Sequence, residues 1–267
     1  MRLIQSRIVA DGVSGDAVAN GEEVVGLMLR DADPEVLKNL IDAGVHIYII
    51  PKDKKLVDLP PFAYLKGERT FDGRRWDEVR GIGDTPLPNG SAIAVGEENL
   101  VLTTGLDSKG YPALHTLVHE FGHAVQLHGL PKEPPESIEQ PGPLSRTVSA
   151  ARAFRAGLGS HPLTRPDWIT AWTGAKIAYA EQREPCSLPR SKELYREAMA
   201  TETKTGLGWY ADANDMEYFA ESTGAYFSTG YTSDTGADTS PALLHEKHPK
   251  MAKFLYAVYG PPKAAGK

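Results

Sequence analysis

Residues 114–127 read LHTLVHEFGHAVQL, and this stretch decides the fold. Its apolar side chains recur three or four residues apart, which is the spacing of one buried face of an α-helix. The residues on that face are Leu114, Leu117, Val118, Phe121 and Val125. The pattern therefore predicts a helix that packs its apolar face against the core and carries the polar residues between.

The polar residues of this helix form an HExxH motif, made of His119, Glu120 and His123. A spacing of four residues brings the two imidazoles onto one face about one turn apart, where both can reach one ion. Zinc accepts neutral imidazoles and keeps one position open in catalytic sites. Glu120 can accept a proton from water beside that position. The motif predicts metal-assisted amide hydrolysis, with His119 and His123 as ligands and Glu120 as general base.

A catalytic zinc site needs a third protein ligand, and two nearby histidines are poor candidates. Position 129 is Gly, so the extended motif with a third histidine six residues past His123 is absent. His128 points to another side of the helix. His115 shares the face of His119, but three imidazoles in line on one straight helix cannot converge on a tetrahedral ion. We expect His115 beside the ligands or in the cleft wall, the alternative being a solvated surface histidine.

A second predicted helix, residues 215–227, offers carboxylates. Glu217 and Glu221 are four residues apart and share one face. One of them could bind zinc while the other orients a ligand histidine. Without the upstream histidines, Glu217 would be read as a surface acid on a helix rich in Asp.

The two motifs together resemble one known family. HEFGH, followed by Tyr210, six further residues and then the string EYFAE at 217–221, is similar to the catalytic domain of anthrax toxin lethal factor and the related bacterial Pro-Pro endopeptidases, which are gluzincins. The resemblance extends weakly over residues 35–258, including 73–79 and 94–97. It implies that Glu217 is the third zinc ligand and that Tyr210 stabilises the oxyanion or protonates the leaving group. The long stretch between His123 and Tyr210 departs from the family.

The rest of the chain predicts an α+β fold of zincin-like type, in which a small sheet packs on the HExxH helix and a second helix supplies the glutamate. Residues 34–43 are a predicted helix, and 45–50 and 91–95 are predicted strands. The tail at 241–259 is predicted to end in another apolar helix, which contains Met251, Phe254, Leu255 and Val258. Helices are also expected at 148–156, 166–182 and 190–204. Glycines and prolines in 57–90 indicate turns around a buried Trp76.

The predicted domain organisation has three parts. A lead segment at 1–30 precedes one metallopeptidase domain at 31–260, which carries an insertion at about 129–190, and residues 261–267 form a flexible tail. The strand at 91–95 is either a cleft edge that pairs with an extended peptide or an ordinary core strand.

Composition narrows the function classes. The net charge of −6 and the absence of Lys and Arg clusters argue against nucleic-acid binding. The single cysteine, Cys186, can form neither an internal disulfide nor a thiolate zinc cluster. We find no secretory h-region and no run long enough to span a membrane. The protein is therefore expected in the cytoplasm of the producing cell, or outside it by a route independent of a signal peptide.

These observations predict a zinc-dependent endopeptidase that holds one Zn²⁺ per chain and acts on a protein or peptide. Its role could be that of a toxin or effector protease, or of a processing enzyme in the producing cell. The alternative is a non-catalytic binding module that retains the metallopeptidase fold. Oligomeric state is left open.

Overall fold

A computed structural model describes residues 8–101, 115–132, 186–201, 205–227 and 240–261. The chain divides into two compact units, Met1–Pro134 with Glu184–Lys267 and Pro135–Arg183. Every described residue belongs to the first. The second unit falls within the predicted insertion and, like the helices predicted at 148–156 and 166–182, lies outside the described residues. The predicted domain boundaries stay a prediction.

The first unit is a mixed α+β structure built on a four-stranded sheet of order β1-β2-β4-β3. β1 and β2 are parallel, β2 and β4 are parallel, and β3 runs antiparallel to β4. The strands are β1 (Ile8–Val9), β2 (Val45–Ile50), β3 (Gly81–Leu87) and β4 (Gly90–Gly96). The helices are α2 (Gly15–Leu29), α3 (Pro34–Asp42), α4 (His115–Ala124), α7 (Leu188–Thr201), α8 (Asp215–Tyr226), α9 (Pro241–Lys247) and α10 (Pro249–Tyr259). None of the described helices has the length and hydropathy needed to cross a membrane.

Local sequence explains where several of these elements begin and end. The Asp33 side chain accepts a hydrogen bond from the backbone N–H of Glu35, and Pro34 occupies the first position of α3. Gly44 then adopts a φ of +66°, which ends the helix and turns the chain into β2. The predicted helix and strand on either side of Gly44 are confirmed.

Other predictions needed correction. Gly81, Gly83 and Pro86 were read as turn signals, yet they lie in β3, an edge strand of the described sheet that carries a bulge where its register shifts between Ile82 and Thr85. The predicted strand at 91–95 is β4, which pairs on both sides and is therefore a core strand and not a cleft edge. Strand β1 and helix α2, which were not predicted, lie within the stretch predicted as a lead segment, and the bounds of that segment stay a prediction. The apolar helix predicted at the end of the 241–259 tail is confirmed as α10, but the short helix before it, α9, was not predicted.

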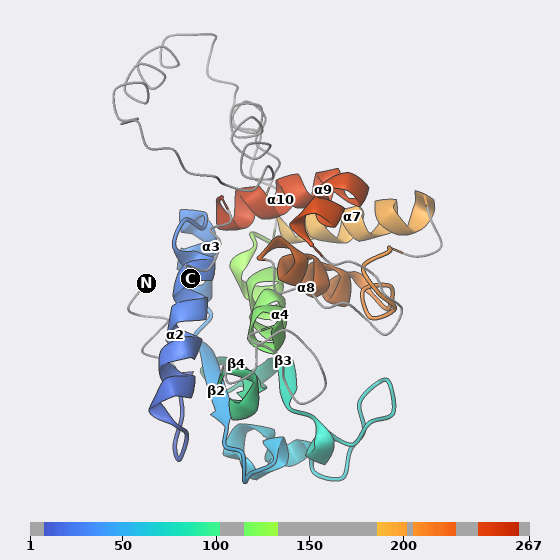
Figure 1. The fold of residues 1–267 in the computed structure, drawn as a ribbon. Coiled ribbons are helices and arrows are strands. Elements are labelled where there is room, and N and C mark those ends of the chain that lie inside the picture. Colours follow the sequence, from blue (N-terminus) through green and yellow to red (C-terminus); the bar gives the residue numbers. More distant parts are fainter. Residues whose placement is uncertain (1–7, 102–114, 133–185, 202–204, 228–239, 262–267) are drawn as a thin grey trace, which may run out of the picture. The chain divides into compact units, whose positions relative to one another are not determined.

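Helix α4 occupies the centre of this unit. It contacts β3 and β4 of the sheet and packs between α2 and α8 (Figure 1). The contact with α8 is close because Gly122 faces it: a Cβ at Gly122 would lie 3.3 Å from the Cα of Ala220. A glycine inside the HExxH motif thus brings the backbone of a second helix beside the two histidines. The five residues after α4, Val125–Gly129, continue as a π-helical turn.

A second apolar cluster lies where the sheet meets short 3₁₀ helices, Leu56–Asp58 and Pro60–Leu65. Phe62 is fully buried there together with Ala92 and Ala94 of β4. Trp76, predicted to be a buried anchor, is partly buried and packs against the same cluster. This cluster fixes the segment that leads into β3.

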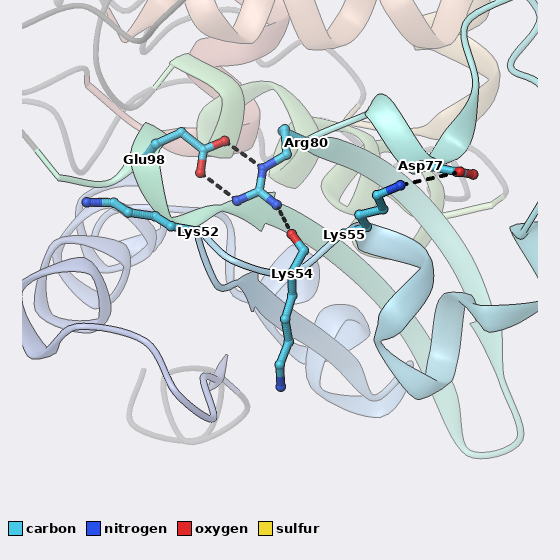
Figure 2. Close-up of a pocket in the computed structure, with 6 residues that line it drawn as sticks. All are labelled: Lys52, Lys54, Lys55, Asp77, Arg80 and Glu98. Atoms are coloured by element: carbon cyan, nitrogen blue, oxygen red, sulfur yellow. Dashed lines mark hydrogen bonds and ion pairs between the residues drawn. The ribbon is translucent and has the colours of Figure 1, made fainter.

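An ion-paired network ties the end of β2 to the start of β3 (Figure 2). The Arg80 guanidinium donates from Nε and Nη2 to the two carboxylate oxygens of Glu98, each at 2.6 Å. It also donates to the backbone carbonyls of Lys54 at 2.5 Å, and of Ile50 and Pro51 at 3.1 Å. The surrounding hollow is lined by Lys52, Lys54, Lys55, Asp77, Arg80 and Glu98. Each nitrogen of this guanidinium has a protein acceptor, so we assign Arg80 a structural role.

Candidate metal centre

Helix α4 presents His119 and His123 on one buried face. The two Nε2 atoms lie 3.1 Å apart, and the rings meet edge to face with centroids separated by 4.8 Å. Both side chains are buried. The i,i+4 spacing thus brings the two imidazole nitrogens together as predicted.

Helix α8 supplies the third group. Asn214 caps the helix and accepts hydrogen bonds from the backbone N–H groups of Met216 and Glu217, both at 2.9 Å. Glu217 is therefore in the first turn, where a carboxylate is favoured by the helix dipole. Its Oε2 lies 3.1 Å from His119 Nε2 and 3.4 Å from His123 Nε2.

These three atoms form a triangle whose size fits a zinc ion. Ligand atoms placed about 2.0 to 2.1 Å from a tetrahedral zinc lie about 3.3 to 3.4 Å from one another. The three distances here are 3.1, 3.1 and 3.4 Å. The donors are two imidazole nitrogens and one carboxylate oxygen, a ligand set used by catalytic zinc sites.

The hydrogen bonding of the cluster supports the same interpretation. Glu217 Oε2 is buried but makes no hydrogen bond with any described residue, although two imidazole nitrogens are close. His119 Nδ1 is likewise buried and makes no hydrogen bond with any described residue, although Glu221 Oε1 lies 3.1 Å away. Buried polar atoms are normally hydrogen-bonded, because leaving one unpaired costs about 1 to 3 kcal/mol. Of the three contacts in the triangle, only the one between the two Nε2 atoms has hydrogen-bond geometry. The approach of Glu217 Oε2 to both imidazoles without such geometry is the arrangement expected of a metal ligand.

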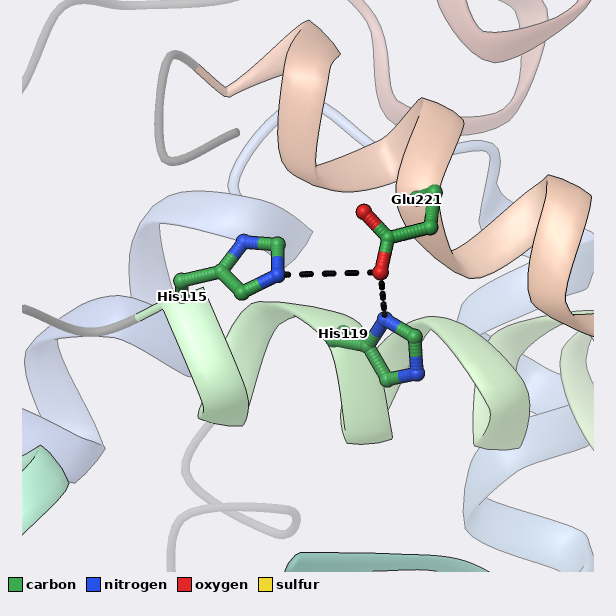
Figure 3. A group of neighbouring side chains, drawn as sticks. All are labelled: His115, His119 and Glu221. Carbon is green, nitrogen blue, oxygen red and sulfur yellow. Dashed lines mark ion pairs between the residues drawn. The ribbon is translucent and has the colours of Figure 1, made fainter. Parts of the chain in front are cut away.

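Glu221 and His115 extend the cluster away from the triangle (Figure 3). Glu221 lies one turn after Glu217, and its Oε1 is also 3.8 Å from His115 Nε2. His115 is only 4% exposed, so the alternative of a solvated surface histidine is wrong. The remaining prediction for His115 is a position beside the metal ligands or in the cleft wall.

His115, His119 and Glu221 could by themselves hold a metal ion, as could His119, Glu120 and His123. The two groups share His119, whose Nε2 faces Glu217 and whose Nδ1 faces Glu221. A histidine ligand commonly directs its second ring nitrogen at a carboxylate, which fixes the ring. The Nε2 side of His119 thus faces the triangle, and the Nδ1 side faces the Glu221 carboxylate.

The charges of the cluster are strongly coupled. Burial raises the pKa of Glu217, but His119 and His123 outweigh it and bring this pKa to about 2. Burial likewise opposes ionisation of Glu221, yet its histidine neighbours hold its pKa well below the usual range. Burial lowers the pKa of His119, while the two carboxylates raise it well above its ordinary value. These shifts favour ionised carboxylates at Glu217 and Glu221 beside a protonated His119 imidazole.

Glu120 and Tyr210 lie beside this cluster. Burial raises the pKa of Glu120, which makes its carboxylate a stronger base than an ordinary one. The ring of Tyr210 packs 5.8 Å from that of His119, measured between centroids. Burial, followed by the charge of Glu217, raises the pKa of Tyr210, so its hydroxyl keeps its proton at neutral pH and can donate a hydrogen bond.

Strand β3 contributes two residues that the sequence analysis missed. A Cβ at Gly81 would lie 2.5 Å from Glu120 Oε1, and a Cβ at Gly83 would lie 2.7 Å from His123 Cδ2. The absence of side chains at these two positions therefore lets an edge strand approach Glu120 and His123 directly. The available signal was the alternation of two glycines across one apolar residue, since period two is the period of a strand.

Two further sequence candidates lie outside the triangle. His128 Nε2 pairs with Asp84 Oδ1 at 2.7 Å, in agreement with its predicted orientation away from the other histidines. Burial raises the pKa of the Cys186 thiol to about 12, which keeps it protonated and unreactive.

Comparisons with known proteins include a distant structural likeness. No family model matches the chain, and no curated protein matches it. Among solved structures, the chain is similar to a Pro-Pro endopeptidase from Paenibacillus alvei, with 17% sequence identity, coverage of 95% of this chain and 97% of that one, and a TM-score of 0.48. At this identity and TM-score, the likeness is too distant to indicate an activity.

Proposed function

We propose that this chain is a zinc-dependent endopeptidase of gluzincin type, with one Zn²⁺ held by His119, His123 and Glu217. The observation that carries the proposal is the buried triangle formed by two imidazole nitrogens and one carboxylate oxygen, with edges of 3.1 to 3.4 Å. When bound, zinc supplies Lewis-acid chemistry, which activates water for attack and polarises a carbonyl.

Glu120 is the general base of this proposal. Glu120 follows His119 directly in α4, and one of its carboxylate oxygens lies within 4.8 Å of a ring nitrogen of His119 and of His123. It takes a proton from the attacking water and passes it to the leaving amine. The reaction is a single displacement, without a covalent acyl-enzyme.

Tyr210 donates a hydrogen bond to the oxyanion that develops on the scissile carbonyl. Its raised pKa keeps the donor proton in place, and its ring packs against His119. Donors aimed at a developing oxyanion contribute about 10²- to 10³-fold in rate. Glu221, with His115 behind it, holds the His119 ring in orientation.

This chemistry is compatible with two biological roles. A toxin or effector protease would cleave a protein of another cell, and a processing peptidase would cleave one in the producing cell. In both, the partner is a protein or peptide in extended form, because peptidase clefts bind substrates as added strands. Strand β3 is the edge of the described sheet that lies next to Glu120.

The proposal is tested with zinc-loaded protein and a mixed library of unstructured peptides, with cleavage read by mass spectrometry. Glu120→Gln is the matched control, because it keeps the shape of the side chain and leaves the triangle intact while removing the base. We expect cleavage by the wild type and a loss of about 100-fold or more in the variant. A folded, zinc-loaded wild type that cleaves no peptide would instead favour the non-catalytic binding module.

A further inference from the structure

Two large aromatic side chains stand exposed beside Tyr210. Phe71 is 67% exposed and Trp209 is 59% exposed. Their ring centroids lie 5.9 Å and 5.1 Å from that of Tyr210. Because the Tyr210 ring in turn contacts His119, the pair lies next to the candidate metal centre. We call Phe71 and Trp209 the aromatic pair.

Phe71 is held in place by a braced hairpin. Arg69 and Arg75 form an antiparallel bridge, and Thr70 and Arg74 close the turn with a backbone hydrogen bond of 2.9 Å. The Arg69 guanidinium donates to the carbonyl of Gly73 at 2.7 Å, where φ is +87°. These contacts are internal to the hairpin, so they fix its tip without burying Phe71.

Trp209 is also carried by an anchored loop. Asp212 accepts hydrogen bonds from the backbone N–H and hydroxyl of Thr205 at 2.6 and 2.7 Å. The Tyr195 hydroxyl donates to the carbonyl of Asp212 at 2.8 Å. These hydrogen bonds hold the loop that carries Trp209, so the aromatic pair is preorganised.

The chemistry around the pair favours an apolar ligand. Arg74 on the hairpin pairs through Nε with Asp72 Oδ2 at 2.7 Å, so its charge is partly neutralised within the hairpin. Exposed aromatic rings bind apolar groups and other rings with little loss of side-chain entropy, and they are enriched at recognition sites. Held rings with open faces next to a reactive centre therefore have the features of a side-chain subsite.

We propose that the aromatic pair is a specificity subsite that binds an aromatic or bulky aliphatic side chain of the peptide, near the bond to be cleaved. The inference rests on the proposed function, since it is the peptide at the metal centre that brings a side chain to Tyr210. It adds a substrate class to that function: extended peptides with a large apolar residue near the scissile bond.

The test uses binding, so that it does not depend on turnover. Zinc-loaded protein is titrated by calorimetry with the blocked hydroxamate of triglycine and with its three versions that carry one phenylalanine. A hydroxamate chelates zinc and so directs each probe to the metal. We expect at least one phenylalanine version to bind the wild type about tenfold more tightly than the glycine probe, an effect of the size that aromatic contacts give.

The variants are Phe71→Ala and Trp209→Ala, with Tyr64→Ala as the matched control because Tyr64 is 63% exposed and lies in a different segment, Pro60–Leu65. The tenfold gain should fall to about threefold or less in each of the first two and persist in the control. Circular dichroism checks that every variant is folded. Equal binding of all probes, or an unchanged gain in both variants, would overturn the subsite alone. If no hydroxamate binds zinc-loaded protein, the metal centre itself is wrong and the subsite falls with it.

Discussion

Two charged clusters of this chain differ in how completely their polar atoms are hydrogen-bonded within the protein. At Arg80, each guanidinium nitrogen reaches a carboxylate or a backbone carbonyl. In the cluster around His119, two buried polar atoms have close charged neighbours but no hydrogen bond among the described residues. The first cluster lines a basic hollow, whereas the second is buried between two helices.

The comparison separates a structural network from a candidate binding site. A hollow with several cations resembles an anion site by composition, but every nitrogen of its central cation already donates to a protein acceptor. Buried ligand-type atoms that converge without hydrogen-bond alignment retain capacity for a further partner. Removing a residue should therefore affect stability at the Arg80 network and metal binding at the His119 cluster.

The largest effect is expected from Gly81→Ala. The new methyl would overlap Glu120 Oε1 and lie 2.8 Å from Thr116 Cγ2, so both side chains must shift. The Glu120 carboxylate is the far end of a flexible side chain and moves at the lower cost. Displacement of the base by about 1 Å should reduce cleavage about 100-fold, with zinc affinity unchanged. Peptide cleavage and chelator competition measure the two properties. Gly15→Ala, which meets no atom within 4 Å, is the control; equal cleavage by the two variants would contradict the assignment.

Glu221→Gln tests the orientation of His119. The amide keeps the shape of the carboxylate but loses the charge that faces Nδ1 at 3.1 Å. We expect zinc affinity to fall about 10- to 100-fold, the usual range for partners of a ligand histidine. Competition with a fluorescent chelator gives the value. An unchanged affinity would show that Glu221 has no part in the metal centre.

Gly83→Ala should act on the metal and not on the base. Its methyl would lie within 3.0 Å of the Cβ and Cγ of His123, atoms at the root of the side chain that cannot swing aside. The shifted imidazole should weaken zinc binding about tenfold, comparable to the loss of a supporting partner. Calorimetric zinc titration of Gly83→Ala and Gly81→Ala compares the two variants, and only the first should bind zinc more weakly. A fall in zinc affinity of equal size in both would contradict this prediction.

The smallest effect on function is expected from Arg80→Ala. The change leaves Glu98 half-buried without its partner and removes hydrogen bonds to three carbonyls, and because the pair is partly exposed we expect a loss of about 1 to 2 kcal/mol in unfolding free energy. Zinc affinity should remain unchanged. Urea unfolding and zinc titration test both statements. If Arg80→Ala lost zinc but kept the wild-type free energy of unfolding, the structural role assigned to Arg80 would be wrong.

Much of the fold follows from the sequence because local signals agree there. The Asp33-Pro34 start, the β-branched strand at 45–50 and the helical periodicity around His119 each depend on neighbouring residues. Strand β3 was missed because glycines and a proline disfavour strands in isolation. The glycines are needed because they face side chains of α4. This packing depends on the tertiary structure, so it cannot be predicted from local strand propensity.

The candidate site divides in the same way. Helical spacing alone predicts that His119 meets His123 and that Glu217 and Glu221 share a face. Which carboxylate completes the triangle depends on how α8 crosses α4, which is set by the close packing of Gly122 on Ala220. The ring contacts of Phe71 with Tyr210 join segments far apart in sequence, so no motif marked them.

The central claim is that His119, His123 and Glu217 hold one zinc ion. The direct test is zinc content and affinity of the wild type, Glu217→Gln and Glu98→Gln, by elemental analysis and calorimetry, with folding checked by circular dichroism. We predict one zinc per chain in the wild type and in Glu98→Gln, and loss or severe weakening in Glu217→Gln. Retention of zinc by folded Glu217→Gln at the wild-type affinity would contradict the account.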